Sequence, residues 1–411
     1  MSLARRLLSF STIPAFSALI PFLVLPVLAR AAGVEAWVAI GVGQSVGGFL
    51  ALAVALGLNV QGPTLVALAP ADQRPDLFAR GTRARLLLLL PALAIGALVS
   101  WLLAPAGSGL EAALMAAAIT LGGLTSSWFL IGLGTPLPLI GFELLPRAVA
   151  TGLGGLLVVL GGSGLVWTYP ALLIIAIVGG VLGYARRVVP LRKLFSGWGD
   201  ALHFARRQLA AAATEAVSGA YTALAVSIVT LGASTAQAGV YISGDKLWRM
   251  GQTVIGAQGN ALQGWVVEND RAHFGQRARR ALILHAGLGI LGLAAFAGIG
   301  PWLTHALFGV GIDRLTGLLF GVAVFCLSLS TATGRHVLIA WGKPKLVLAS
   351  VIIGAVVGVP TSLALAAAFG AVGGSAGLAA AEGSVLVSQA IMILATRRAG
   401  IGSVGRASLR S

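Results

Sequence analysis

Ionisable side chains lie inside several long apolar stretches of this sequence, where a charge is costly. Glu143 and Arg147 are four residues apart in one stretch, and Asp245 and Arg249 have the same spacing in another. On a helix this spacing puts both side chains on one face, with the acid before the base, which favours an ion pair. A charge near the bilayer centre costs roughly 2.5–3.5 kcal/mol on insertion scales, so it usually faces a partner or a wet cavity. Each pair could therefore be structural or could face a substrate.

Three other ionisable residues have no such partner in their own stretch. If Asp245 pairs with Arg249, Lys246 is left without a local partner, and Glu215 and Glu382 are the only charges in their stretches. Burial favours the neutral form of a carboxyl group, so either glutamate could take part in proton coupling or make a structural hydrogen bond. The candidate coupling or pairing acids are Glu143, Glu215, Asp245 and Glu382.

The composition shows what must surround these charges. Of the 411 residues, 57% are hydrophobic and 10% are charged, and the mean hydropathy is +0.95. Soluble domains carry roughly 25% charged residues, and disorder needs low hydrophobicity, so both are excluded. Continuously apolar runs of roughly 20 residues predict transmembrane helices rather than strands. The chain is therefore predicted to be an all-α polytopic membrane protein with about twelve transmembrane helices. The predicted spans are 7–29, 36–58, 86–104, 112–133, 138–161, 165–185, 208–231, 239–264, 281–300, 315–333, 346–368 and 374–396.

The 28 lysines and arginines are distributed unevenly between the predicted loops. Basic clusters lie before the first span and after alternate spans, whereas Arg30 and Arg314 are the cations in loops on the opposite side. The positive-inside rule then places the N- and C-termini in the cytoplasm. The net charge of +16 is explained by this orientation, and we expect no nucleic acid as a partner because no basic run forms a separate domain. The apolar run after Met1–Arg6 is interpreted as an uncleaved signal anchor.

Two short patterns recur in the same order in the two halves of the chain. Gly81-Thr-Arg-Ala-Arg85 before the third span matches Gly275-Gln-Arg-Ala-Arg279 before the ninth. Leu130-Ile-x-x-Gly-x-Pro136 after the fourth span matches Leu338-Ile-x-x-Gly-x-Pro344 after the tenth. Six spans per half is an even number, so the two halves have the same orientation and form a parallel repeat.

This duplication predicts the domain organisation. We expect an N-terminal six-helix lobe over 1–190, a cytoplasmic linker over 191–207, and a C-terminal six-helix lobe with a short basic cytoplasmic tail over 208–411. Such lobes usually enclose a central cavity and rock against each other, which favours a transporter over a channel.

No motif for catalysis or metal binding is found in the sequence. A Walker loop and His-Glu-x-x-His are absent, Cys326 is the only cysteine, and the five histidines are scattered. We therefore expect no enzyme activity, no cofactor and no metal, and we interpret the histidines as packed or interfacial side chains.

Three stretches resemble the bacterial polysaccharide repeat-unit flippases (Wzx type, polysaccharide biosynthesis or O-antigen transporters) of the multidrug/oligosaccharidyl-lipid/polysaccharide exporter superfamily. They are Pro21-Phe-Leu-Val-Leu-Pro-Val-Leu-Ala-Arg-Ala-Ala-Gly33, Trp128-Phe-Leu-Ile-Gly-Leu-Gly-Thr-Pro136 and Ala238-Gly-Val-Tyr-Ile-Ser-Gly-Asp-Lys-Leu247. The resemblance extends diffusely over most of the chain.

The resemblance implies a transporter of the bacterial plasma (inner) membrane with two six-helix lobes around a central cavity. It implies that undecaprenyl-pyrophosphate-linked oligosaccharide moves from the cytoplasmic to the outer leaflet, and that basic cavity residues hold the pyrophosphate. The matching substrate-binding candidates are Arg30, Arg147, Lys246 and Arg249. The implied partners are this lipid-linked oligosaccharide, membrane lipids, a polysaccharide polymerase and other export machinery.

Three alternatives remain open. A multidrug or cation-coupled exporter of the same superfamily often carries an acidic residue in its first span, and span 7–29 has none. A major-facilitator transporter is expected to have Gly-x-x-x-Asp-Arg between its second and third spans, where Gly81-Thr-Arg-Ala-Arg85 lacks the acid. A membrane glycosyltransferase or polymerase usually has a sizeable extracytoplasmic loop, and the predicted outer loops are short.

Overall fold

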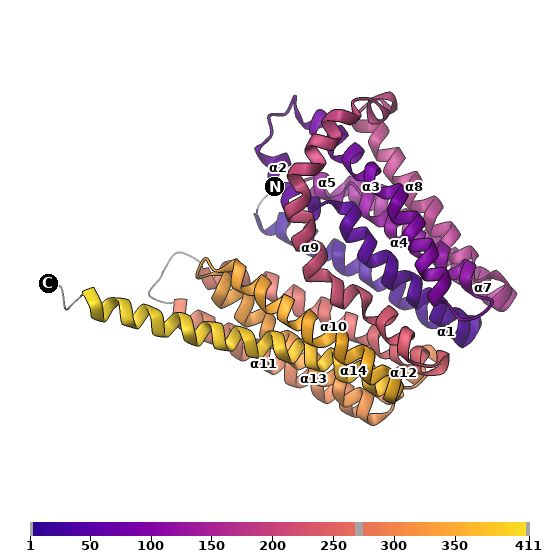
Figure 1. Cartoon of the computed structure of the whole chain (residues 1–411). Helices are drawn as coiled ribbons and strands as arrows, with labels where there is room; N and C mark the ends of the chain where they lie inside the picture. The colour runs from indigo at the N-terminus through magenta and orange to yellow at the C-terminus, as the bar shows by residue number, and fades with distance from the viewer. Residues whose placement is uncertain (1–2, 268–273, 408–411) are drawn as a thin grey trace. The chain divides into compact units, whose positions relative to one another are not determined.

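The computed structural model describes residues 3–267 and 274–407, and the regular elements of these residues are helices (Figure 1). The α-helices are α1 (Leu3–Ala55), α2 (Leu58–Leu68), α3 (Arg74–Leu103), α4 (Gly109–Leu121), α5 (Ser127–Leu133), α6 (Pro136–Leu139), α7 (Leu145–Gly161), α8 (Thr168–Val188), α9 (Trp198–Gly232), α10 (Thr235–Val267), α11 (Phe274–Gly298), α12 (Gly300–Phe308), α13 (Arg314–Ala332) and α14 (Pro344–Ala407). Three 3-10 segments are η1 (Gly122–Leu124), η3 (Gly162–Leu165) and η4 (Leu191–Phe195), and two π-helical segments are η2 (Ile140–Leu144) and η5 (Thr333–Ile339).

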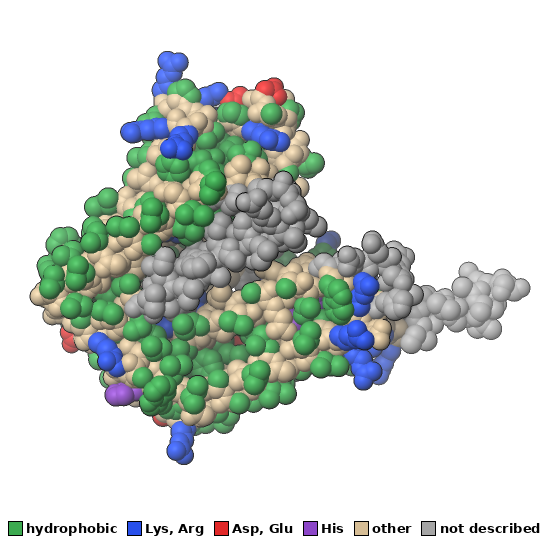
Figure 2. All heavy atoms as spheres, turned by 180° about the vertical axis from the view of Figure 1, so that it is seen from behind, with side chains coloured by type: hydrophobic (Ala, Val, Ile, Leu, Met, Phe, Trp, Pro, Cys, Tyr) green, Lys and Arg blue, Asp and Glu red, His purple; other side chains and the backbone are tan. Residues whose placement is uncertain are grey.

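The predicted fold class, an all-α polytopic membrane protein, is confirmed. Eight helices of the described chain are long and apolar enough to cross a membrane, or nine if the bent pair Ala211–Val217 and Gly219–Gly232 is one span. Large apolar side chains point outward, such as Leu90 and Leu160, each about three-quarters exposed. Figure 2 shows hydrophobic side chains over broad areas of one face, with Lys and Arg in a few small groups. Such surfaces suit lipid rather than water.

Two of the eight apolar helices are longer than one crossing of a bilayer requires, and each of them contains a break in its helical backbone. Gly33 has φ 81° inside α1, and Gly370 has φ 57° inside α14. Both values lie in the left-handed region, which glycine adopts without the steric penalty of a Cβ atom. The breaks lie between predicted spans 7–29 and 36–58 and between 346–368 and 374–396, so each long helix contains two predicted spans.

One compact unit contains Met1–Leu231 with Leu307–Gly309, which we call unit 1. Helix α4 packs against α1, α3 and α8 at its centre, and α7 packs against α1 and α8. A buried aromatic cluster closes one part of this core, with Phe78, Trp128, Phe129 and Tyr184 in stacked and edge contacts. These contacts join α3, α5 and α8.

The second compact unit contains Gly232–Ala306 and Val310–Ser411, which we call unit 2. Helix α13 lies at its centre and packs against α10, α11 and α14. Gly289 and Gly321 allow a close approach of α11 and α13, since a Cβ atom at either glycine would lie about 3.0 Å or less from atoms of the facing helix. Such small residues are typical of tightly packed transmembrane helices.

The second repeated pattern folds in the same way in both units. Gly134 has φ 69°, its N–H bonds to the carbonyl of Ile131, and the next N–H bonds to the carbonyl of Leu130. Gly342 has φ 70°, with equivalent bonds to Ile339 and Leu338. Both sites are Schellman motifs, in which a left-handed glycine ends a helix. The proline that follows opens the next helix, where its missing N–H is not needed.

The segments between the predicted spans contain more helix than the sequence analysis expected. The stretch before the third span, interpreted as loop, contains α2 and the first turns of α3. The lobe boundaries stay a prediction. By its packing, α9 belongs to unit 1, and its Asp200 lies 3.6 Å from Arg83 and 3.8 Å from Arg80 of α3.

Candidate functional site

The ionisable residues of α10 form a charge cluster in which Asp245 and Lys246 are buried and Arg249 is half-buried. Arg249 Nε lies 2.7 Å from Asp245 Oδ2, and Asp245 is 0% exposed. The predicted local pair is thereby confirmed. The other carboxylate oxygen, Oδ1, is buried without a hydrogen-bond partner in the described chain. The pair therefore leaves one anionic oxygen unsatisfied in the interior of unit 2, which is a costly arrangement.

Lys246 follows Asp245 directly and is 5% exposed. Successive residues of an α-helix are about 100° apart around its axis, so Lys246 leaves the helix in another direction from Asp245, whereas Arg249 is its neighbour at the i,i+3 position. Tyr241, one turn before Asp245, is buried and packs against Phe320 at 5.4 Å between ring centroids. Two of the four predicted substrate-binding cations thus lie on one helix of unit 2.

Glu143 and Arg147 lie in unit 1, but they do not form a hydrogen-bonded pair like the pair on α10. Glu143 belongs to the π-helical segment η2, and its Oε1 accepts the backbone N–H of Ser126 at 2.7 Å. Arg147 Nε and Nη2 are buried without a hydrogen-bond partner in the described residues. The π-turn changes the rotation between positions four apart, and this is why the regular i,i+4 geometry is not reached.

Arg85 is a buried cation whose role the sequence analysis missed, because it was counted with the cytoplasmic cations. It is 1% exposed, and its Nη1 donates to the carbonyls of Gly123 and Thr125 at 3.1 and 2.8 Å. The guanidinium also lies over the Trp128 ring, 5.4 Å from its centroid. The signal that could have identified Arg85 is the run of apolar residues that starts immediately after it, since α3 already begins at Arg74.

Arg85 and Glu143 together provide hydrogen-bond partners for the backbone groups at the break between α4 and α5. The chain leaves the helix through η1 and extended Thr125, so the carbonyls of Gly123 and Thr125 and the N–H of Ser126 lose helical partners. A buried backbone group without a partner costs about 1–3 kcal/mol. The arginine supplies donors to the carbonyls and the glutamate accepts from the N–H, so both charges have a structural task here.

The remaining predicted residues are spread over the two units. Arg30 is exposed and lies beside the turn at Gly309 in unit 1. Glu215 of α9 accepts a hydrogen bond from Asn59 Nδ2 of α2 at 3.1 Å. Glu382 of α14 is buried in unit 2 and acts electrostatically on Cys326 of α13. Unit 1 thus contains Arg30, Glu143, Arg147 and Glu215, and unit 2 contains Asp245, Lys246, Arg249 and Glu382.

His285 and His336 are two further buried residues. From the sequence, the five histidines were interpreted as scattered side chains with packed or interfacial positions. The rings of His285 and His336 pack together inside unit 2, with centroids 5.4 Å apart. They are 51 positions apart in the chain, so spacing alone could not pair them. In the described part of the chain, no group of three or more His, Cys, Asp or Glu side chains is placed to hold a metal ion.

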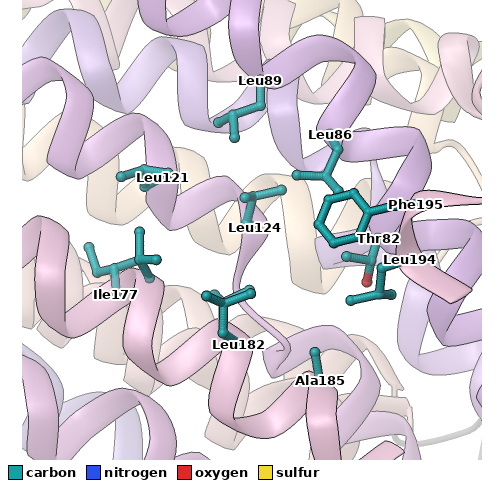
Figure 3. A pocket seen from close by; sticks show the side chains of 12 residues that line it. Thr82, Leu86, Leu89, Leu121, Leu124, Ile177, Leu182, Ala185, Leu194 and Phe195 are labelled. Atoms are coloured by element: carbon teal, nitrogen blue, oxygen red, sulfur yellow. The ribbon is translucent and has the colours of Figure 1, made fainter. Parts of the chain in front are cut away.

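Apolar hollows also occur within the units. One in unit 1, of about 180 Å³, is lined by Leu86, Leu121, Leu182 and Phe195 among others, from α3, α4, α8 and η4 (Figure 3). Its lining is almost wholly aliphatic or aromatic, and it includes none of the predicted charged site residues. It therefore suits a hydrocarbon chain rather than an ionic headgroup.

Neither a protein-family model nor a curated protein sequence matches the chain. Solved structures do match it in fold. An inward-facing multidrug resistance MATE family transporter of the MOP superfamily is 15% identical, with a TM-score of 0.69 over 93% of this chain and 96% of that chain. The lipid II flippase MurJ, in an inward closed conformation, is 13% identical, with a TM-score of 0.71 over 94% of this chain and 87% of that chain.

A third match is a MOP superfamily transporter from Pyrococcus furiosus, at 15% identity and a TM-score of 0.57 over 96% of this chain and 95% of that chain. At such low identities the likeness shows the fold and not the cargo. These structural neighbours are transporters, and this chain is a multi-pass membrane protein with the fold of MOP superfamily transporters.

Proposed function

We propose that this protein is a flippase that moves undecaprenyl-pyrophosphate-linked oligosaccharide from the cytoplasmic to the outer leaflet by alternating access. The observation that carries the proposal is the charge cluster on α10, in which buried Lys246 and half-buried Arg249 lie close to buried Asp245. A cation at membrane depth usually faces a partner or a wet cavity, and a pyrophosphate is a polyanion that such a cation can bind. The fold shared with a lipid II flippase supports a lipid-linked cargo.

The two cations have different tasks in this proposal. Asp245 orients Arg249 through Oδ2 and neutralises part of its charge, whereas Lys246 leaves the helix in another direction. Lys246 is therefore the principal contact of the pyrophosphate, with Arg249 and Arg147 as further candidates and Arg30 as a contact at the outer end. The protein works in the bacterial plasma membrane with both termini in the cytoplasm, beside a polysaccharide polymerase and other export machinery.

Reconstitution tests the proposal directly. Proteoliposomes that contain the purified chain and a fluorescent undecaprenyl-pyrophosphate oligosaccharide would be treated with an impermeant quencher, which reports the fraction of lipid in the accessible leaflet. We expect the wild-type protein to exchange the lipid between leaflets faster than protein-free vesicles. Exchange at the protein-free rate would contradict the proposal. Lys345→Ala, which removes an exposed cation, is the matched control for substitutions of the buried cations.

A multidrug exporter is the second candidate, because the chain also shares its fold with a multidrug resistance MATE family transporter. A gene deletion separates the two functions. Loss of the flippase should deplete surface glycan and leave its lipid-linked precursor in the cytoplasmic leaflet, whereas loss of an exporter should raise drug sensitivity with surface glycan unchanged. We favour the flippase because predicted span 7–29 contains no acidic residue.

A further inference from the structure

The apolar hollow of unit 1 lies at the ends of two predicted spans (Figure 3). Helix α3 lines it with Leu86, the first residue of predicted span 86–104, and α8 lines it with Ala185, the last residue of predicted span 165–185. The distribution of cations predicts that both of these span ends face the cytoplasm. With this orientation the hollow lies among the acyl chains of the cytoplasmic leaflet, close to their headgroups.

The hollow can hold hydrocarbon and reaches the surface of the unit. Its volume is about 180 Å³, and an apolar cavity of roughly 150 Å³ is known to stay dry and to bind a small hydrocarbon such as benzene. The lining residues Leu121 and Leu124 are buried, whereas Val178 of α8 and Phe195 of η4 are exposed. A void without partner atoms forfeits the dispersion contacts of its lining. An apolar chain that enters from the lipid past Val178 and Phe195 would restore these contacts.

Two exposed arginines lie next to lining residues in the chain. Arg186 comes immediately after Ala185 at the end of α8, and Arg192 of η4 comes two positions before a lining leucine. Neither arginine takes part in an ion pair within the described chain. The next residue, Lys193, differs because its Nζ pairs with Asp76 of α3. Arg186 and Arg192 therefore offer their charges to an anion at the surface.

The segment η4 and the residues after it have the composition of a membrane interface. Phe195 is 60% exposed and Trp198 is 40% exposed, and exposed aromatic rings beside basic residues are typical of the headgroup region. Arg83 of α3 holds this segment, because its guanidinium donates hydrogen bonds to the carbonyls of Lys193 and Ser196. The hollow thus has a basic and aromatic rim that is tied to α3.

We propose that unit 1 binds one anionic glycerophospholipid of the cytoplasmic leaflet, with an acyl chain in this hollow and the phosphate against Arg186 and Arg192. Clusters of basic residues immediately cytoplasmic of a transmembrane helix are a recognised signal for anionic headgroups. The bound lipid adds packing between α3, α8 and η4, and it therefore stabilises the cytoplasmic end of unit 1. This site goes beyond the proposed transport and does not depend on which cargo is carried.

Charge and size favour this lipid over other occupants. A zwitterionic headgroup brings a cation of its own, which Arg186 and Arg192 repel, whereas both arginines attract a headgroup with a net negative charge. A lipid-linked cargo has a far longer polyprenyl chain than a hollow of about 180 Å³ can enclose, and its proposed contact Lys246 lies in unit 2. We therefore assign the hollow to a resident phospholipid and not to the cargo.

Binding of defined lipids to the purified full chain tests the site without a transport assay. Native mass spectrometry in detergent would compare dioleoyl phosphatidylglycerol, dioleoyl phosphatidylcholine and undecaprenyl phosphate, each added at the same concentration. We expect phosphatidylglycerol to be retained at least threefold more often than phosphatidylcholine, and undecaprenyl phosphate not to displace it. Equal retention of the two phospholipids would overturn the proposal. Displacement by undecaprenyl phosphate would overturn it as well, because it would identify a site for the cargo instead.

A double substitution tests the headgroup contacts. Arg186→Gln together with Arg192→Gln should lower the preference for phosphatidylglycerol to less than 1.5-fold, because the hollow still takes a chain of either phospholipid. The matched control is Arg279→Gln together with Arg280→Gln, which removes two exposed cations from α11 in unit 2. An unchanged preference in the first variant, or an equal loss in the control, would contradict the assignment.

A tryptophan at the mouth of the hollow tests the contact with the acyl chain. Val178→Trp should fill the opening and lower the retention of both phospholipids at least threefold. Ile175→Trp, at an exposed position of α8 outside the lining, should retain them as the wild-type protein does. Phosphatidylglycerol should also raise the unfolding temperature of the wild-type protein and of Ile175→Trp, but not that of Val178→Trp. Equal effects of the two tryptophans on retention, or an equal rise in unfolding temperature, would overturn the placement of the chain.

Discussion

Among the charged residues of α10, the contacts of each side chain distinguish a structural role from a binding role. Arg249 makes an ion pair with a carboxylate that is 0% exposed, so its removal strands an uncompensated buried charge. Lys246 is not one of the two partners of that ion pair, so its removal keeps the pair intact. The same distinction applies in unit 1, where Arg85 bonds backbone carbonyls and Arg147 has two nitrogens without hydrogen-bond partners in the described chain.

Lys246→Ala should reduce lipid exchange at least tenfold with little loss of protein from the membrane, and Lys246→Arg should keep more activity because it keeps the charge. Arg249→Ala should lower both stability and exchange, since it leaves the buried carboxylate of Asp245 without its ion-pair partner. The measurements are lipid exchange and thermal unfolding of the purified proteins. Full exchange by a stable Lys246→Ala protein would remove Lys246 from the site.

Arg85→Ala and Arg147→Ala should differ although both remove a buried arginine from unit 1. Arg85→Ala leaves the carbonyls of Gly123 and Thr125 without their donor, and at about 1.5–3 kcal/mol for each bond to a charged group it should strongly destabilise the protein. Arg147→Ala should lower the rate of lipid exchange, and it should reduce the stability of the protein less than Arg85→Ala does. Equal losses of stability in the two variants, measured by thermal unfolding, would show that Arg147 is structural as well.

At the scale of elements, local capping motifs determine where helices begin and end. The Schellman motifs at Gly134 and Gly342 end the helical segments that follow α4 and α13, and the residue after each is followed by a proline that starts the next helix. Asp313 caps the other end of α13, where its Oδ1 accepts the N–H groups of Leu315 and Thr316, each at 2.9 Å.

Gly342→Ala should destabilise unit 2 by about 1–2 kcal/mol, because φ 70° is a left-handed conformation that a Cβ atom disfavours. Apart from the adjoining residues, the described chain has no atom within 4 Å of the position that this Cβ atom would occupy, so the cost is that of the backbone alone. Gly287→Ala is the matched control, since Gly287 lies in helix α11 with equally open space, and there alanine should be neutral or stabilising. Similar unfolding temperatures for the two variants would contradict the argument.

Asp313 should make the stability of the protein depend on pH at the acid end. Burial alone would raise the pKa of this carboxyl group, but hydrogen bonds from Thr316 and Leu315 outweigh it and lower the pKa from its ordinary value. The stabilisation is therefore complete above the ordinary aspartate pKa of about 3.9 and is lost as the pH falls through the lower folded-state value. Asp313→Ala should cost about 1 kcal/mol at pH 7, and this difference should shrink near pH 3. A difference that grows on acidification would exclude the cap as its source.

At the scale of the whole molecule, the membrane orientation is the property that the distribution of cations predicts. Exposed positions report it best, because a buried cysteine would not react from either side. Four such exposed positions, which lie outside the predicted spans, are Ala71, Ala106, Ser234 and Gly275.

Single cysteines in a Cys326→Ser background test this orientation. Ala106→Cys and Ser234→Cys should react with an impermeant thiol reagent applied to intact spheroplasts, whereas Ala71→Cys and Gly275→Cys should react only after lysis. Reaction of Ala71→Cys from outside would overturn the assignment of both termini to the cytoplasm.

Much of the fold could be predicted from the sequence, because the physical requirements of a bilayer are local. A helix must be long and apolar to cross the membrane, and its backbone groups must be satisfied within it. The same holds for the glycine and proline that end helices, since the repeated Leu-Ile-x-x-Gly-x-Pro pattern forms two Schellman motifs with the same bonds. The Asp245–Arg249 pair was predictable too, because four residues of regular α-helix bring its two ends together.

The sequence by itself therefore determined the membrane class, the breaks between spans and the ion pair on α10. Only the tertiary structure decided what the other charges do. A π-turn directs Glu143 to the backbone of Ser126, Arg85 reaches carbonyls 38 and 40 positions away, and His285 meets His336 across two elements. The physical reason is that hydrogen bonds in a low-dielectric interior depend on which groups a fold leaves unsatisfied, and that depends on how distant segments pack.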